Sequence, residues 1–209
     1  MSTTIHSDRR LPEEFYRNTD VVEVSKLLLG QYLCTEFDGQ RCVGKIVETE
    51  AYRGPDDKAC HAHNNRYTKR SKTMFEAGGI AYVYLCYGIH HLFNVVTALE
   101  GMPHAVLIRA IEPVENLPLM LSRRKFAQVK PQLTAGPGVM TKALGISKLH
   151  NGLSLYDPDS PIWLSPGEAP LAEEAIIASP RVGIPYAEEC IDWPWRFRVK
   201  GSKWTSPAK

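Results

Sequence analysis

Residues 81–113 read AYVYLCYGIHHLFNVVTALEGMPHAVLIRAIEP, and this stretch decides the fold. The run 81–87 is rich in aromatic and β-branched residues, which favours a strand. Gly88 allows a turn, after which residues 90–99 can return as the partner strand. Residues 104–113 form a third strand-like run. Three strands with short connections predict an antiparallel sheet.

The regions on either side of this stretch carry shorter patterns. We expect a helix over 21–30, opened by an Asp20–Glu23 pattern and ended by Gly30. Strands are expected over 31–37 and 42–52, joined by an Asp38-Gly39 turn. Further along the chain we expect helices over 114–129 and 138–146, and short strands around 160–164, 174–180 and 195–199. The strands cluster, and the long helices do not alternate with them. The sequence therefore predicts an α+β fold, a single mixed domain with a curved, mainly antiparallel β-sheet and flanking helices.

Length and composition suit one folded domain. The chain has 209 residues, of which 44% are hydrophobic and 23% charged. We expect residues 1–10 to be loose, residues 11–204 to form the domain and residues 205–209 to be a tail. Without a long apolar run or a signal-peptide core, a cytoplasmic protein is expected. The five cysteines form no CxxC pair, which favours reduced, buried thiols.

The formal charge of +2 hides a segregated pattern. Residues 1–57 and 149–195 carry net charges of −4 and −7, whereas residues 58–148 and 196–209 carry +8 and +5. Basic groups attract phosphates without reading sequence, so the positive segments are candidates for a nucleic-acid surface. We expect them to share one surface, with most of residues 149–195 turned away from it.

The long segment 53–79 lacks periodicity and is rich in Gly, Pro, Asn and basic residues. A structureless stretch of this length is usually functional or disordered. The tyrosines Tyr82, Tyr84 and Tyr87 follow it, and their rings could stack on bases or enter a base step. The alternative is a solvated loop beside tyrosines that only pack.

The densest polar signal is VETEAY at residues 47–52. In a strand, the period of two places Glu48, Glu50 and Tyr52 on one face. Carboxylates in an apolar strand are costly to bury unless they are paired or used chemically. The alternative is a structural ion pair on an exposed face.

His61 and Tyr84 lie on separate segments that could join Tyr52 in a flat aromatic pocket with a carboxylate at its rim. Cys60, His61 and His63 are too crowded in sequence for a typical zinc site, so we expect no metal. A lone histidine is more often structural than catalytic, and we expect this of His63, His90, His91, His104 and His150.

Several segments together resemble the alkyladenine (3-methyladenine) DNA glycosylase family. They are VETEAYRGPDDKACHA (47–62), MFEAGGIAYVYLCYGIHHLFNVV (74–96), AVLIRAIEP (105–113), GPGVMTKALGI (136–146) and RVGI (181–184). The resemblance runs in order from about residue 11 to residue 204. The chain is most similar to a minimal bacterial-type member, because it lacks the long N-terminal extension of mammalian ones.

The resemblance implies a single domain with a protruding β-hairpin that intercalates into DNA. It implies a monofunctional enzyme that flips alkylated or deaminated purines out of double-stranded DNA. Such an enzyme hydrolyses the N-glycosidic bond and leaves an abasic site, without lyase activity. No cofactor and no catalytic metal are expected. We also expect a monomer with no obligate protein partner and no membrane association, located in the bacterial cytoplasm with the nucleoid.

The resemblance also assigns roles to residues. Glu50 falls on the acid that activates water for attack at the sugar C1′ carbon, and Arg109 helps to hold that water. Base binding falls on Tyr52 and His61 on one side of the base, Tyr84 on the other, Asn94 at the pocket floor and the backbone of Val182. The DNA-contacting positions are the wedge Tyr87, Ile89 beside it, and Arg66, Lys69, Arg70 and Lys72 for the phosphates.

Two other readings of the sequence remain open. A non-catalytic protein of this fold could bind damaged or bent DNA with the same basic loop and tyrosines. Such a binder has no need of a carboxylate like Glu50 beside a phosphate-rich ligand. A related hydrolase acting on free nucleosides would explain Glu50 but not the wedge or the basic loop.

Overall fold

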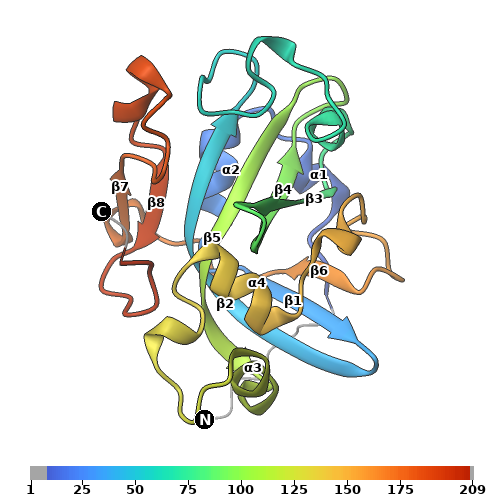
Figure 1. The fold of residues 1–209 in the computed structure, drawn as a ribbon, viewed down its shortest axis with the longest axis vertical. Helices are drawn as coiled ribbons and strands as arrows, with labels where there is room; N and C mark the ends of the chain where they lie inside the picture. The colour runs from blue at the N-terminus through green and yellow to red at the C-terminus, as the bar shows by residue number, and fades with distance from the viewer. Residues whose placement is uncertain (1–8, 208–209) are drawn as a thin grey trace.

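One antiparallel sheet organises the chain. The structure, a computed structural model, describes residues 9–207 (Figure 1). Within these residues the strands are β1 (Tyr32–Phe37), β2 (Gln40–Arg53), β3 (Ala81–Cys86), β4 (His90–Thr97), β5 (His104–Glu115), β6 (Ile162–Ser165), β7 (Ile176–Ser179) and β8 (Arg196–Val199). Each of the strand pairs is antiparallel. The predicted α+β class is confirmed.

The long strand β2 is where the sheet divides. One edge of β2 pairs with β5, which continues to β4 and β3. Along the other edge, residues 40–45 pair with β1 and residues 48–50 pair with β8. Figure 1 shows these two branches of the sheet: β7 and β8 lie on one side of the molecule, and β1 and β6 lie on the other. Strand β2 therefore belongs to both branches, and Glu48 lies where they part.

Bulges bend the β2–β5 pair at this place. Glu48 is opposite Ala110 and Thr49 is opposite Ile108, so Arg109 is an extra residue in β5. Two further register shifts lie closer to the start of β2. Bulges increase local twist and re-aim side chains, and they are common beside active sites. They account for the expected curvature, and one of them sets the direction of Arg109.

The helices are short and pack against the sheet. They are α1 (Glu13–Tyr16), α2 (Val21–Leu27), α3 (Leu117–Arg124) and α4 (Pro137–Leu144), with 3₁₀ helices η1 (His63–Asn65), η2 (Lys72–Phe75), η3 (Pro131–Leu133), η4 (Lys148–His150), η5 (Glu173–Ala175) and η6 (Glu188–Asp192). The Asp20 carboxylate accepts hydrogen bonds from the amides of Val22 and Glu23, as the capping pattern predicts. Helix α2 packs on β2 and β5, and α4 packs on β4 and β5.

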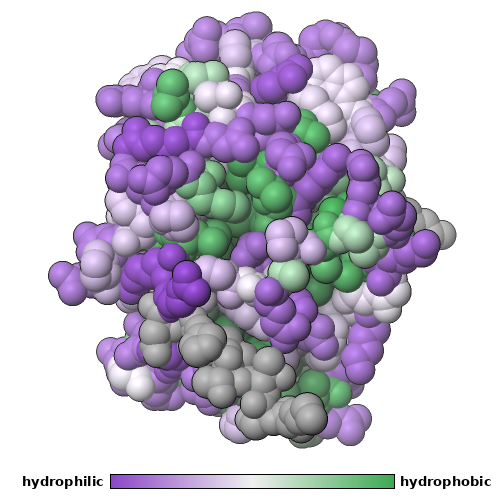
Figure 2. All heavy atoms as spheres, turned by 180° about the vertical axis from the view of Figure 1, so that it is seen from behind, coloured by the Kyte–Doolittle hydropathy of each residue, from purple (hydrophilic) through white to green (hydrophobic). Residues whose placement is uncertain are grey.

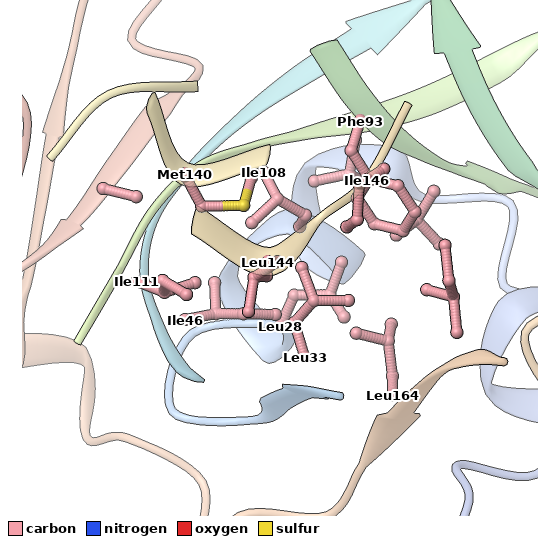
Figure 3. Packing of buried hydrophobic residues seen from close by; sticks show 14 of the residues in the cluster. Leu28, Leu33, Ile46, Phe93, Ile108, Ile111, Met140, Leu144, Ile146 and Leu164 are labelled. Carbon is pink, nitrogen blue, oxygen red and sulfur yellow. The ribbon is translucent and has the colours of Figure 1, made fainter. Parts of the chain in front are cut away.

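The main hydrophobic core lies between these helices and the sheet. Figure 3 shows Leu28, at the end of α2, close to Ile46 of β2 and Leu144 of α4. All three are fully buried. Seen from behind, the surface is largely hydrophilic at its periphery, and apolar atoms gather near the middle (Figure 2). No helix within residues 9–207 is both long and apolar enough to cross a membrane.

One predicted helix is wrong in its bounds. The expected helix over 114–129 is present only as α3, Leu117–Arg124. Residues 114–115 complete β5 instead, and Glu115 pairs with Val43 of β2. Lys125 adopts a left-handed conformation with φ of 56° and ends the helix. The apolar residues after Lys125 gave a helical pattern in sequence without continuing the helix.

The sequence predicts a loose start over residues 1–10 and a tail over residues 205–209. Residues 1–8 of the expected loose start and 208–209 of the expected tail lie outside the described residues. Arg10 donates hydrogen bonds to the carbonyls of Pro158 and Ser160. Ser206, in the expected tail, is 6% exposed and contacts Glu48. Ser206 thus packs beside Glu48 of β2.

Candidate active site

The strand alternation gives the sheet a polar face opposite its helix-covered core. Val83 of β3 and Phe93 of β4 belong to the main core, whereas Tyr82, Tyr84 and Asn94 alternate with them. The segment 54–79 covers this second face, where Cys60 and Met74 form a small buried cluster with Tyr82. The segment is therefore ordered and covers this face of the sheet. A cavity of about 620 Å³ lies here.

Glu50 is completely buried and held by three groups that line this cavity. Its Oε1 accepts a hydrogen bond of 2.8 Å from the backbone amide of Val182 and lies 3.2 Å from Nη1 of Arg109. Its Oε2 accepts a hydrogen bond of 2.8 Å from the Tyr52 hydroxyl. Burial and the nearby Glu50 charge raise the pKa of Tyr52 well above its usual value, so Tyr52 stays a donor.

Glu48 is also completely buried, and it balances the arginines of the site. Its Oε1 accepts hydrogen bonds of 2.8 Å from Nε of Arg109 and Nε of Arg196, and its Oε2 accepts one from the Ser206 amide. Burial works to raise the pKa of Glu48, but Arg109, the Ser206 amide and Arg196 together hold it below its usual value. Arg109 thus bridges both carboxylates, and Glu48 and Glu50 share a strand face as predicted.

A second buried ion pair, between Arg181 and Asp57, positions groups that contact Glu50. Nη1 and Nη2 of Arg181 donate to the two carboxylate oxygens of Asp57 at 2.5 and 2.8 Å, and both side chains are fully buried. The guanidinium also lies 4.8 Å from the centre of the Tyr52 ring. Because Val182 follows Arg181 directly, this pair holds two of the groups that contact Glu50.

The aromatic residues form one connected wall. His61 Nδ1 is 2.9 Å from the Tyr82 hydroxyl, and the His61 ring meets Tyr84 edge to face at 4.7 Å between ring centres. Burial lowers the pKa of His61 to about 4, helped by the nearby charges of Arg70 and Arg66. His61 is therefore neutral at pH 7. Asn94 is nearly buried in the same wall and donates from Nδ2 to the Tyr82 carbonyl at 3.0 Å.

The β3–β4 hairpin ends in an exposed turn at the cavity mouth. Tyr87 and Gly88 both have positive φ, 50° and 73°, and the Ile89 amide donates to the Cys86 carbonyl. Tyr87 is 87% exposed and Ile89 72% exposed, although Tyr87 also lines the cavity. A bulky residue with positive φ is strained, and such strain is often retained for function. Tyr186, also exposed, lies on the same rim.

The four basic residues expected near the DNA backbone are all exposed, but they differ in their position relative to the cavity. Arg66, Lys69 and Lys72 lie outside the cavity wall, whereas Arg70 is part of it. The cavity is not lined by the positive segments alone. Residues 182–184 and 186 belong to the acidic segment, yet they line the cavity. Arg109 and Arg196 come from the positive segments but are buried against Glu48.

Other polar residues noted in the sequence have structural contacts. His150 accepts a hydrogen bond from the Ser147 amide, and His91 accepts one from the Lys148 amide.

All five cysteines are free thiols, and only Cys86 is not fully buried. Within residues 9–207, no three His, Cys, Asp or Glu side chains are grouped so that they could hold a metal ion.

The chain matches one known protein family over most of its length. Residues 14–203 match the family described as methylpurine-DNA glycosylase (MPG). The chain belongs to the methylpurine-DNA glycosylase family. A protein of Chlamydia felis named "Putative 3-methyladenine DNA glycosylase" is 50% identical to it, over 92% of this chain and 98% of its own. A protein of Bacillus cereus (strain G9842) with the same name is 47% identical, over 93% and 98% of the two chains.

The methylpurine-DNA glycosylase family carries functions in DNA repair, and the expected family resemblance is confirmed. In this member, the cavity joins most positions that the resemblance assigned, namely Tyr52, His61, Tyr84, Tyr87, Asn94, Arg109 and Val182, while Glu50 lies buried behind it. The sequence did not indicate Asp57, Arg181 or Arg196. Each has its key partner more than 120 residues away, so no local spacing could have revealed it.

Proposed function

We propose that this glycosylase hydrolyses the bond between a damaged purine and its deoxyribose in double-stranded DNA. The reaction would leave an abasic site and would involve no lyase step. The observation that carries the proposal is the buried Glu50, held by Tyr52, Arg109 and Val182 behind an aromatic cavity. A glycosylase needs one carboxylate beside the reacting carbon and a flat pocket for the leaving base, and this arrangement supplies both.

Glu50 would activate the water that attacks C1′ of the sugar. As the base leaves, positive charge develops on the sugar, and a nearby carboxylate stabilises it while accepting the proton of the water. Arg109 and the backbone at Val182 would position this water, since both already contact Glu50. The buried network around Glu48 supports the role, because it keeps Arg109 directed at Glu50.

The aromatic wall would hold the extruded base. Tyr52 and His61 would lie on one side of an alkylated or deaminated purine and Tyr84 on the other. His61 and Tyr84 touch edge to face, so their rings would separate as the base enters. Asn94 would discriminate against the 2-amino group of normal guanine from the pocket floor. The neutral state of His61 adds no cation to this pocket.

The hairpin tip would enter the DNA. Tyr87 would fill the gap left by the flipped nucleotide, with Ile89 packing beside it, because both are exposed at the cavity mouth. Arg66, Lys69 and Lys72 would contact phosphates. We further propose that the protein acts as a monomer in the cytoplasm, near the nucleoid, without cofactor or obligate partner.

The test uses duplex DNA with a single hypoxanthine or ethenoadenine. The protein is incubated with the duplex, and half of each sample is then treated with alkali. We expect strand breaks at the lesion only after alkali, because the DNA strand is cleaved at an abasic site under alkaline conditions. Binding without alkali-labile sites would instead support a non-catalytic binder, and breaks without alkali would reveal lyase activity.

A further inference from the structure

Arg70 differs from the other basic residues of its segment in what it contacts. Its guanidinium carbon lies 4.6 Å from the centre of the Tyr84 ring, a distance typical of cation–π stacking. It also lines the cavity, whereas its exposed neighbours Lys69 and Lys72 do not. The chain therefore brings a cation of its own to the ring assigned to stack on the base.

The charge of Arg70 is not neutralised locally. Among the ion pairs of the described residues, none joins Arg70 to a carboxylate. Its charge also reaches the aromatic wall, where it lowers the pKa of His61 and opposes the rise in the pKa of Tyr82. An additional cation beside this wall would be repelled by the Arg70 guanidinium, and solvent at the cavity mouth would screen part of that repulsion.

Damaged purines differ in charge. Methylation at N3 or N7 leaves the nucleoside with a positive charge, whereas deamination to hypoxanthine leaves it neutral. Electron-rich tyrosines alone would favour the cationic purines. Because Arg70 stacks on Tyr84, the attraction of this ring for a cation is already satisfied by the guanidinium. The guanidinium also repels a second cation.

We propose that Arg70 determines substrate preference by charge, lowering the excision of cationic N-alkylated purines relative to neutral damaged purines. This inference rests on the proposed glycosylase function. It gives Arg70 a place at the base pocket in addition to, and distinct from, the phosphate contacts expected of its segment.

The test compares two lesions in the same duplex sequence, 7-methylguanine as the cationic base and hypoxanthine as the neutral one. Single-turnover excision rates are measured for the wild type and for Arg70→Met, which keeps an unbranched chain without charge. We expect the rate ratio of 7-methylguanine to hypoxanthine to rise about threefold to tenfold in Arg70→Met. Arg70→Lys keeps the charge, so its ratio should stay close to that of the wild type.

Lys69→Met is the matched control, because it removes one positive charge from the adjacent exposed position outside the cavity. It should lower both rates by the same factor. If Arg70→Met also lowers both rates equally and leaves the ratio unchanged, Arg70 is only a phosphate contact and the inference is overturned. Wild-type protein that excises neither base would contradict the proposed function itself, which separates the two failures. Circular dichroism of each variant checks that it is folded.

Discussion

The β2–β5 pair and the β3–β4 hairpin tip are opposite in character, although they meet at one cavity. In the first, Glu48 and Glu50 are completely buried and every carboxylate oxygen has a partner. In the second, Tyr87 and Ile89 project into solvent. The groups proposed for chemistry are thus in position before DNA arrives, and those proposed to grip DNA are free until it does.

This difference has a physical reason. A buried charge without a partner costs several kcal/mol, so a carboxylate inside the sheet must be fully paired, and full pairing immobilises it. Catalytic groups benefit from such preorganisation. A wedge gains nothing from internal contacts, since the energy of its contacts is needed in the complex. Substitutions in the two regions should therefore differ in their effects on stability and on excision.

The largest effect on stability is expected from the buried region, with Glu48→Gln. This change removes the buried negative charge that Nε of Arg109 and Nε of Arg196 contact. We expect a loss of about 3–5 kcal/mol in unfolding free energy and a fall in Tm of about 10 °C, measured by thermal and denaturant unfolding. The exposed Glu174→Gln serves as control and should change stability by less than about 0.5 kcal/mol. Equal stabilities would show that the network is not needed to hold the sheet.

Part of each region can be predicted from the sequence. Alternation placed Glu48, Glu50 and Tyr52 on one face, and the turn at Gly88 placed Tyr87 at a hairpin tip, because both follow from local geometry. The capping by Asp20 was predictable for the same reason.

The supporting contacts could not be predicted in this way. The bulge that aims Arg109 depends on the register between two strands about 60 residues apart. The Asp57–Arg181 pair and the contact of Ser206 with Glu48 depend on how distant segments pack. The place of Arg70 over Tyr84 likewise follows from the course of the irregular segment and not from its composition.

His61 lies between the two regions and gives a smaller, pH-dependent effect. Its pKa of about 4 in the folded protein lies below the usual 6.5. The unfolded chain therefore binds a proton as pH falls below about 6.5, while the folded chain does not until about 4, and stability is lost across this window. His61→Gln should lose on the order of 2 kcal/mol less stability between pH 7 and 4. Denaturant unfolding at several pH values measures this, and identical pH profiles would contradict it.

The smallest effect on stability is expected at the hairpin tip. Tyr87→Gly relieves a left-handed conformation and should stabilise the fold by about 1 kcal/mol. The same change removes the proposed wedge, so excision from duplex DNA should fall about tenfold. Leu149→Ala, at another highly exposed apolar side chain, should leave excision unchanged. A Tyr87→Gly variant that is less stable and fully active would reverse the division between the two regions.

The most direct test of the central claim is Glu50→Gln on duplex DNA with one ethenoadenine. Single-turnover excision and duplex binding are measured on the same preparation. The buried carboxylate is proposed to act in the chemical step, so the excision rate should fall by about 10²–10⁴-fold while the Kd changes less than about threefold. An excision rate within tenfold of the wild type, or a loss explained by weaker binding alone, would contradict the assignment of catalysis to Glu50.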